Sequence, residues 1–315
     1  MYLIPEFIRS YPMGPALRQW IGLSDAEYLG TDAQTPTSAE EDAFSTWVLD
    51  LASDQPIVLI EQFTNVIEEL VGMHLAATAL KLVGYFPDLV DDNDFRTQFQ
   101  IGNASMIAGD LELAEISFRR AQEIIPEDTA PYVNLTQIYY HQNRDEEARA
   151  WCMSGLDADL NHARLWEQLA VLEIADHGAE AGASRILELS KARGSWAGLS
   201  LACDMAAPEN PEMKLAHLEP LYYQGLRDKT FLIELTAVMG AAGKYEQIAP
   251  VVWQAEKLGT SPLPWQLWMH AAQAQLGLGK GDLCREYLTK VQNIPDLPES
   301  VPPVIAQLMQ ESTEA

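Results

Sequence analysis

The feature that most constrains this chain is a recurrence of small and large apolar residues at a step of about 34 residues. The stretch GDLELAEISFRRAQEIIPED, residues 109–128, has a Gly-Asp turn, then Ala114, Phe118 and Ala121 at spacings of four and three, then Pro126. Those spacings place the three side chains on one face of a helix, and the proline ends that helix. One such helix cannot bury its apolar face alone, so a recurring unit predicts helices stacked on their neighbours.

The pattern returns in the units that begin at residues 129, 163, 229 and 265. Its places are filled there by Tyr132, Leu135, Thr136, Tyr139, Ala148, Cys152 and Gly155; by Trp166, Leu169, Ala170, Gly182, Ile186 and Leu189; by Leu232, Leu235, Thr236, Met239, Gly243, Val252 and Ala255; and by Trp268, Ala271, Ala272, Gly279, Cys284 and Leu288. Small residues at the eighth, twentieth and twenty-seventh places let two helices approach closely, and the large residues fill the remaining space.

This spacing resembles the tetratricopeptide repeat, a helix-turn-helix unit that stacks into a solenoid. The resemblance covers most of residues 95–298 and implies an all-α helical-repeat solenoid, a right-handed superhelix. The predicted units are 95–128, 129–162, 163–194, a degenerate 195–228, 229–262 and 265–298. Pro220 is expected to kink or shorten its helix, and Pro250 predicts that the helix containing Val252 begins later than the pattern indicates.

The segments outside the repeats are predicted from composition and helical periodicity. Residues 1–37 read as an extended amino-terminal arm with one short helix near PALRQWIGL, and residues 299–315 as a carboxy-terminal cap and tail. Residues 38–94 read as an acidic, non-repeat helical cap that opens with Ser38 as an N-cap and packs against residues 95–121. The stretch from Tyr2 to Pro12 is expected to dock on helices of this chain or of a second copy, with a disordered terminus as the alternative.

The charge of the chain limits its partners. With 46 acidic and 20 basic residues its net charge is −26, which argues against nucleic acid or an anionic membrane. Residues 1–94 hold 16 acids and 3 bases, and no Lys or Arg lies between Arg18 and Lys81. This acidic stretch is either a solvated surface or a site for a basic segment. Because no signal peptide or membrane-spanning segment is recognised, the chain is predicted to be cytoplasmic.

No catalytic, cofactor or metal site is predicted. The stretch GLGKGD, residues 277–282, has Gly281 where a phosphate loop needs Ser or Thr, so it is interpreted as a turn. HGAE at 177–180 and DLVDDNDF at 88–95 are also interpreted as turns. The six histidines lack ligand spacing, and the three cysteines, Cys152, Cys203 and Cys284, form no CxxC pair.

The resemblance implies a concave groove lined by defined places of each first helix: the second, fifth, sixth, ninth, twelfth and thirteenth. The predicted partner-binding groove consists of Arg96, Phe99, Asn103, Met106, Ile107, Asn134, Gln137, Tyr140, His141, Arg164 and Gln168. In chaperone-binding members, the places of Asn103, Asn134 and Arg164 clamp a peptide's terminal carboxylate. Phe99 and Gln168 stand where that clamp needs cations, so an apolar, aromatic groove is favoured. An inner face that binds nothing is the other alternative.

The sequence therefore predicts a non-catalytic scaffold or adaptor that holds a protein or peptide partner in this groove. One alternative is an assembly or secretion chaperone for a basic client. A weaker one is a regulatory protein or enzyme with an unrecognised catalytic site. Whether the chain forms a homo-oligomer stays open.

Overall fold

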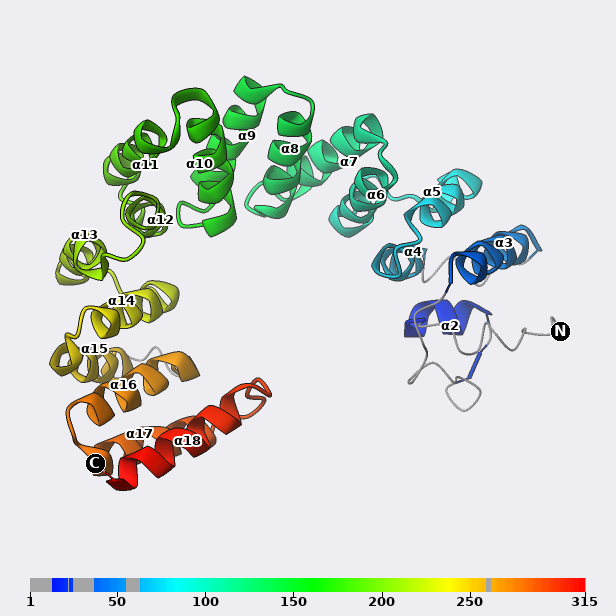
Figure 1. Cartoon of the computed structure of the whole chain (residues 1–315). Coiled ribbons are helices and arrows are strands. Elements are labelled where there is room, and N and C mark those ends of the chain that lie inside the picture. Colours follow the sequence, from blue (N-terminus) through cyan, green and yellow to red (C-terminus); the bar gives the residue numbers. More distant parts are fainter. Residues whose placement is uncertain (1–12, 22, 25–36, 55–62, 259–261, 315) are drawn as a thin grey trace. The chain divides into compact units, whose positions relative to one another are not determined.

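The computed structural model describes residues 13–21, 23–24, 37–54, 63–258 and 262–314. Within them the chain forms seventeen α-helices and one 3-10 turn, and those ranges contain no strand. The chain divides into two compact units, Met1–Asp159 and Leu160–Ala315 (Figure 1). The predicted all-α helical-repeat fold is confirmed, whereas the right-handed sense of the superhelix stays a prediction.

The first unit is a succession of packed helices. Its elements are α2 (Pro15–Ile21), α3 (Ser38–Asp54), α4 (Phe63–Gly72), α5 (Ala76–Tyr85), η3 (Pro87–Leu89), α6 (Phe95–Ala108), α7 (Leu111–Ile124), α8 (Ala130–His141) and α9 (Asp145–Ala158). Helices α4 and α5 both pack against α6, α7 contacts α6 and α8, and α8 pairs with α9. Helices α4 to α8 thus each touch a neighbour on both sides along the stack.

The second unit has the same construction. Its helices are α10 (Ala163–His177), α11 (Ala179–Arg193), α12 (Trp196–Ala206), α13 (Pro211–Tyr223), α14 (Lys229–Ala241), α15 (Tyr245–Lys257), α16 (Trp265–Gly277), α17 (Gly281–Gln292) and α18 (Val301–Glu314). Consecutive helices pack throughout, and α14 also contacts α16. Leu235, Val252, Leu267 and Leu288 are fully buried in one continuous core of this unit.

The opening motif forms the predicted helical hairpin. Gly109 ends α6 in the left-handed conformation, with φ of 83°, and the Asp110 side chain accepts a hydrogen bond from the Leu113 backbone N–H at 3.1 Å. Ala114, Phe118 and Ala121 are fully buried. A Cβ on Gly102 would lie 2.7 Å from the Phe118 ring, so the small residue in α6 is what admits the large one from α7.

Hydrogen bonds repeat the step seen in the sequence. They join side chains about one repeat apart: Asn134 to Asn103 at 3.3 Å, Ser195 to Asn161 at 3.1 Å, Ser200 to Glu234 at 2.7 Å and Thr236 to His270 at 2.8 Å. The same step joins Thr97 to Thr64 at 2.7 Å and Thr78 to Ser45 at 2.8 Å. Helices α3 to α6 therefore stack with repeat spacing, although residues 38–94 lack the repeat's sequence pattern.

Two local predictions are wrong. The N-cap of α3 is Thr37, because its hydroxyl and its backbone N–H both donate to Glu40, at 2.8 and 2.7 Å, in a capping box. The sequence offers the same spacing one residue later, at Ser38 and Glu41, and the structure uses the earlier pair. Helix α15 begins at Tyr245 and continues through Pro250, so the proline does not delay its start. Helix α13 likewise continues past Pro220.

The short helix expected near PALRQWIGL is α2, and it is anchored in the core. Leu17 and Trp20 are buried against α4. The Glu69 carboxylate, from α4, accepts hydrogen bonds from the backbone N–H groups of Ala16 and Leu17, both at 2.8 Å. A distant side chain thus satisfies the first amide groups of α2. The predicted docking of Tyr2 to Pro12 lies outside the described residues.

Candidate partner-binding face

Nine of the predicted groove residues lie on α6 and α8, in the first unit. Asn134 donates from Nδ2 to Oδ1 of Asn103 at 3.3 Å, so these two amides do lie together. Asn103 in turn donates to Gln100 at 3.4 Å. Met106 and Gln137 are half-buried, and His141 is exposed beside Tyr140, with ring centroids 6.0 Å apart.

Phe99 is held mainly by the chain itself. Its ring stacks on Phe95 at 5.7 Å between centroids, with an interplanar angle of 8°, and meets Phe118 edge-on at 5.5 Å. Phe118 is fully buried in the α6–α7 hairpin. Phe99 therefore packs mainly on other rings of the chain, and a partner would contact only its remaining half-exposed part.

The apolar side chains that reach solvent on this face are Ile107 and Tyr140. Their exposed fractions are 52% and 39%, and they stand at the end of successive first helices, α6 and α8. In the second unit the equivalent helix α10 also exposes Val171 and Ile174. Ile107 and Tyr140 stand at the thirteenth and twelfth places of successive units, and exposed apolar residues on neighbouring first helices are typical of a surface that another polypeptide covers.

The charges on these first helices are already paired. Arg96 forms an ion pair with Glu68 of α4, and both side chains are well exposed. Arg164 pairs with Glu167 at 3.1 Å on α10. Gln168 is half-buried on the same helix, in the second unit. A partner carboxylate would have to compete with a protein carboxylate at each arginine, which weakens the carboxylate-clamp hypothesis.

A cavity of about 480 Å³ in the second unit is not among the predicted features. It is lined by Thr236, Ala237, Gly240 and Ala241 of α14, Tyr245 and Ile248 of α15, and His270, Gln273 and Ala274 of α16. His270 is the sixth residue of its unit and Gln273 the ninth, so the rule that selected Asn103 would have selected both. Burial lowers the pKa of His270, against the opposing field of Glu234.

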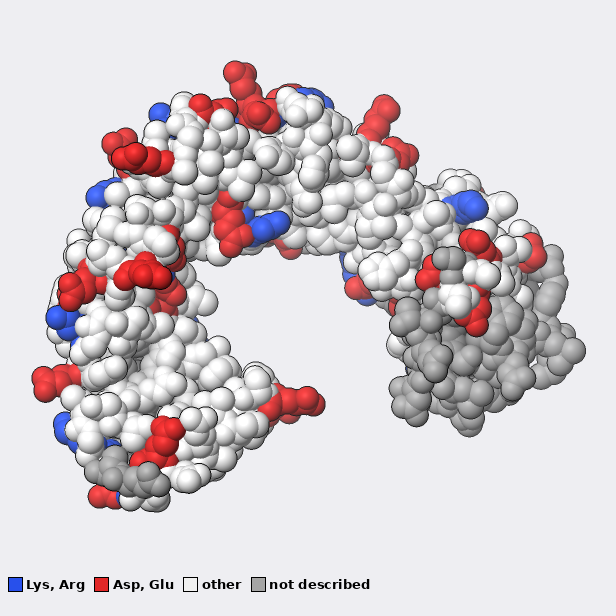
Figure 2. All heavy atoms as spheres, viewed as in Figure 1, with Lys and Arg blue, Asp and Glu red and all other residues white. Residues whose placement is uncertain are grey.

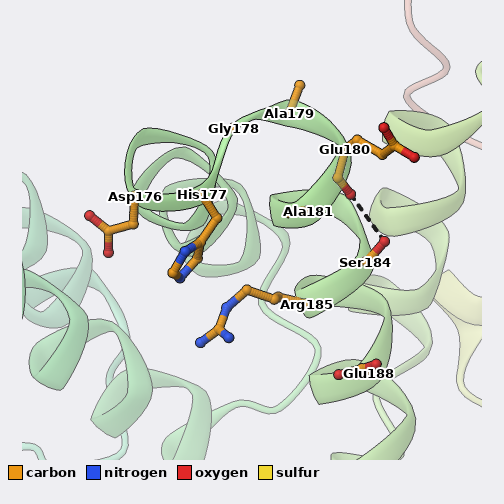
Figure 3. A pocket seen from close by; sticks show the side chains of 9 residues that line it. All are labelled: Asp176, His177, Gly178, Ala179, Glu180, Ala181, Ser184, Arg185 and Glu188. Carbon is orange, nitrogen blue, oxygen red and sulfur yellow. Dashed lines mark hydrogen bonds between the residues drawn. The ribbon is translucent and has the colours of Figure 1, made fainter.

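A second hollow, of about 940 Å³, lies beside the turn between α10 and α11. Gly178 forms this turn with φ of 82°, as the interpretation of HGAE as a turn requires. His177 and Arg185 reach toward the same space from the two helices, and Ser184 bonds back to the Glu180 carbonyl (Figure 3). Arg185 is paired with the buried carboxylate of Glu173 at 2.5 Å, and His177 lies 3.6 Å from that carboxylate. The cation of this hollow is therefore already neutralised, and its rim is acidic.

Among the residues that the structure describes, no helix is both long and apolar enough to cross a membrane. The same residues contain no group of three or more His, Cys, Asp or Glu side chains that could hold a metal ion.

Comparison with known proteins identifies the repeat. Residues 95–128 match the tetratricopeptide repeat family. A solved tetratricopeptide repeat protein from Parabacteroides merdae is 14% identical, with a TM-score of 0.38 over 81% of this chain and 98% of that one. The pilF protein of Pseudomonas aeruginosa is 14% identical, with a TM-score of 0.35 over 70% of this chain and 96% of that one.

A third structure contains the TPR2AB domain of yeast Sti1 in a complex with pHSP90. It is 13% identical, with a TM-score of 0.32 over 81% of this chain and 98% of that one. At these TM-scores none of the three structures indicates what this chain binds. No curated protein matches the sequence.

Proposed function

Because residues 95–128 match the tetratricopeptide repeat family and the described helices stack as a helical repeat, we propose that this chain is a non-catalytic scaffold or adaptor that holds a partner polypeptide on its first helices. The observation that carries the proposal is the exposure of Ile107 and Tyr140 at inner places of successive first helices. The predicted groove residues other than these two contribute shape and hydrogen-bonding groups. A partner that covers this face would gain from removing both apolar side chains from water.

The test replaces both exposed side chains while leaving the core intact. In the double variant Ile107→Ser, Tyr140→Ser, capture of the partner from native lysate should fall by about 100-fold, since two lost apolar contacts of about 1.5 kcal/mol each total about 3 kcal/mol. The matched control is Ile116→Ser on α7, whose side chain is also highly exposed but lies on a second helix. Equal capture by both variants and the unchanged chain would refute the proposal.

The charge favours a second candidate, an assembly or secretion chaperone that covers a basic client. The acidic surplus of residues 1–94 supports it, and acidic side chains outnumber basic ones on the face shown in Figure 2. Such a complex should weaken strongly with salt, whereas the apolar contacts of the first proposal should not. A basic partner, a cytoplasmic location, a homo-oligomer and the lack of enzymatic activity all stay predictions. Size-exclusion chromatography with light scattering tests the oligomer.

A further inference from the structure

The cavity between α14, α15 and α16 differs from the rest of this acidic protein because no Asp, Glu, Lys or Arg is among the nine residues that line it. A charged group that entered it would lose water without gaining an opposite charge, which is costly. The cavity therefore selects an uncharged group. Its walls are apolar where α14 contributes Ala237, Gly240 and Ala241, and polar where α16 contributes His270 and Gln273.

The contacts of Thr236 favour one tautomer of His270. The Thr236 hydroxyl lies 2.8 Å from the Leu232 carbonyl oxygen and 3.1 Å from that of Ile233, and both carbonyls can only accept. With its single proton directed to these carbonyls, the hydroxyl accepts the 2.8 Å hydrogen bond from Nδ1–H of His270. In this assignment the neutral ring carries its proton on Nδ1, which leaves Nε2 as an acceptor.

This acceptor has no partner among the residues that the structure describes, since the one hydrogen bond of His270 there is made by Nδ1. An apolar ligand that covered Nε2 would leave it unsatisfied, whereas a ligand with an O–H or N–H at its far end would bond to it. The volume of about 480 Å³ is toward the lower end of the roughly 300–1,000 Å³ found for ligand pockets. It can admit one aromatic side chain.

We propose that this cavity receives a tyrosine side chain of the partner polypeptide, with the ring against Ala237, Gly240 and Ile248 and the phenol O–H donating to Nε2 of His270. The apolar wall takes the ring and the bare acceptor takes the hydroxyl proton. The uncharged lining excludes Lys, Arg, Asp and Glu at this position of the partner. This inference rests on the proposed function for the identity of its ligand, but the cavity can be tested without any partner.

The direct test uses p-cresol, the tyrosine side chain alone, with the full chain labelled with ¹⁵N. The ring nitrogens of His270 should show the Nδ1–H tautomer at pH 7.5, and p-cresol should shift Nε2 in a saturable manner. Toluene, which lacks the hydroxyl, should bind about tenfold more weakly. An Nε2–H tautomer, no saturable shift, equal binding of toluene, or tighter binding of 3-methylindole, the tryptophan side chain, would each overturn the assignment.

Two variants complete the test. Ala237→Leu places a larger side chain at an exposed position of the cavity wall and should abolish p-cresol binding. Its matched control, Ala192→Leu, changes an exposed alanine of α11 outside the cavity and should bind p-cresol normally. Binding retained in Ala237→Leu would overturn the proposal.

Partner capture separates the failure of this inference from the failure of the proposed function. If capture is lost with Ile107→Ser, Tyr140→Ser but unaffected by Ala237→Leu, the scaffold stands and the tyrosine site falls. If p-cresol binds as expected and Ala237→Leu lowers capture while Ile107→Ser, Tyr140→Ser does not, the proposed face is wrong and the cavity stands.

Discussion

The attachment of α2 gives the sharpest test of how the first unit is held together. Glu69 accepts two backbone hydrogen bonds, from Ala16 and Leu17, whereas its neighbour Glu68 forms an exposed ion pair with Arg96. The two glutamates are adjacent on α4 and identical in chemistry, so they are matched. A charge-assisted hydrogen bond contributes about 1.5–3 kcal/mol, while an exposed ion pair contributes about 0–1 kcal/mol.

Glu69→Ala should therefore destabilise the first unit by about 2–3 kcal/mol, because water can replace part of the lost bonding at the helix start. Glu68→Ala should cost less than about 1 kcal/mol. At roughly 2–4 °C per kcal/mol for a unit of this size, Glu69→Ala lowers the melting temperature by about 4–12 °C. Glu69→Gln, which keeps one carbonyl acceptor, should fall between the two.

Hydrogen exchange locates the effect. In Glu69→Ala, the amides of Ala16 and Leu17 should exchange faster, followed by those of the rest of α2. In Glu68→Ala, their exchange rates should stay the same. Leu17 and Trp20 are buried, so the release of α2 would also expose apolar surface. Equal stability losses in the two alanine variants, or unaltered exchange at Ala16 and Leu17, would refute the reasoning.

Three further predictions concern other parts of the chain. Gly281→Ala should cost about 1–3 kcal/mol and speed hydrogen exchange in α18, because its Cβ would lie 2.1 Å from the Ser312 carbonyl oxygen. Gly84→Ala, whose Cβ would have nothing within 4 Å, should stabilise α5 by roughly 0.5–1 kcal/mol. Equal effects of the two substitutions on stability would contradict this reasoning. The pKa of His270 is lowered from 6.5 by burial, with Glu234 of α14 opposing, so the unfolded chain binds more protons below pH 6.5 and stability is lost as pH falls. His270→Gln should flatten this loss in denaturant titrations at pH 7.5 and 5, and an unchanged pH dependence would count against it. If the partner is basic, reversing the charges of Glu41, Asp42 and Asp50 should weaken binding about tenfold at low salt and much less above 0.15 M, where the Debye length is below about 8 Å. Glu40 is left unchanged because it caps α3. Binding that is insensitive to both salt and these charges would exclude a basic partner.

The repeat core could be predicted because its signals are local. Gly109 and Asp110 each act on backbone groups within a few residues, and Gly102 meets Phe118 in the same hairpin. The bond from Ala16 to Glu69 spans 53 residues, and no local pattern marks it. The competition between Thr37 and Ser38 was undecidable from spacing, since each has a glutamate three residues later.

Pro250 was misjudged for a different reason. A proline inside a helix removes one backbone hydrogen bond, but burial of Ile248, Val251 and Val252 on the core face of α15 favours continuing the helix through it. The tertiary contacts of the helix outweighed the local penalty. Helix α13 also continues past Pro220, with Leu218 and Tyr222 buried on either side, and the kink expected at Pro220 stays a prediction.

The groove predicted from the sequence does not include the cavity, and the reason lies in three places of the first helix. The ninth, twelfth and thirteenth places hold Asn103, Met106 and Ile107 in α6, and Gln137, Tyr140 and His141 in α8. In α14 the same places hold Ala237, Gly240 and Ala241. A search for chemically reactive side chains passes over such small residues, yet their absence of bulk is what leaves room for the cavity beside His270. The same scaffold positions therefore present protruding side chains in one unit and a receiving hollow in the other, and each would select a different feature of a partner.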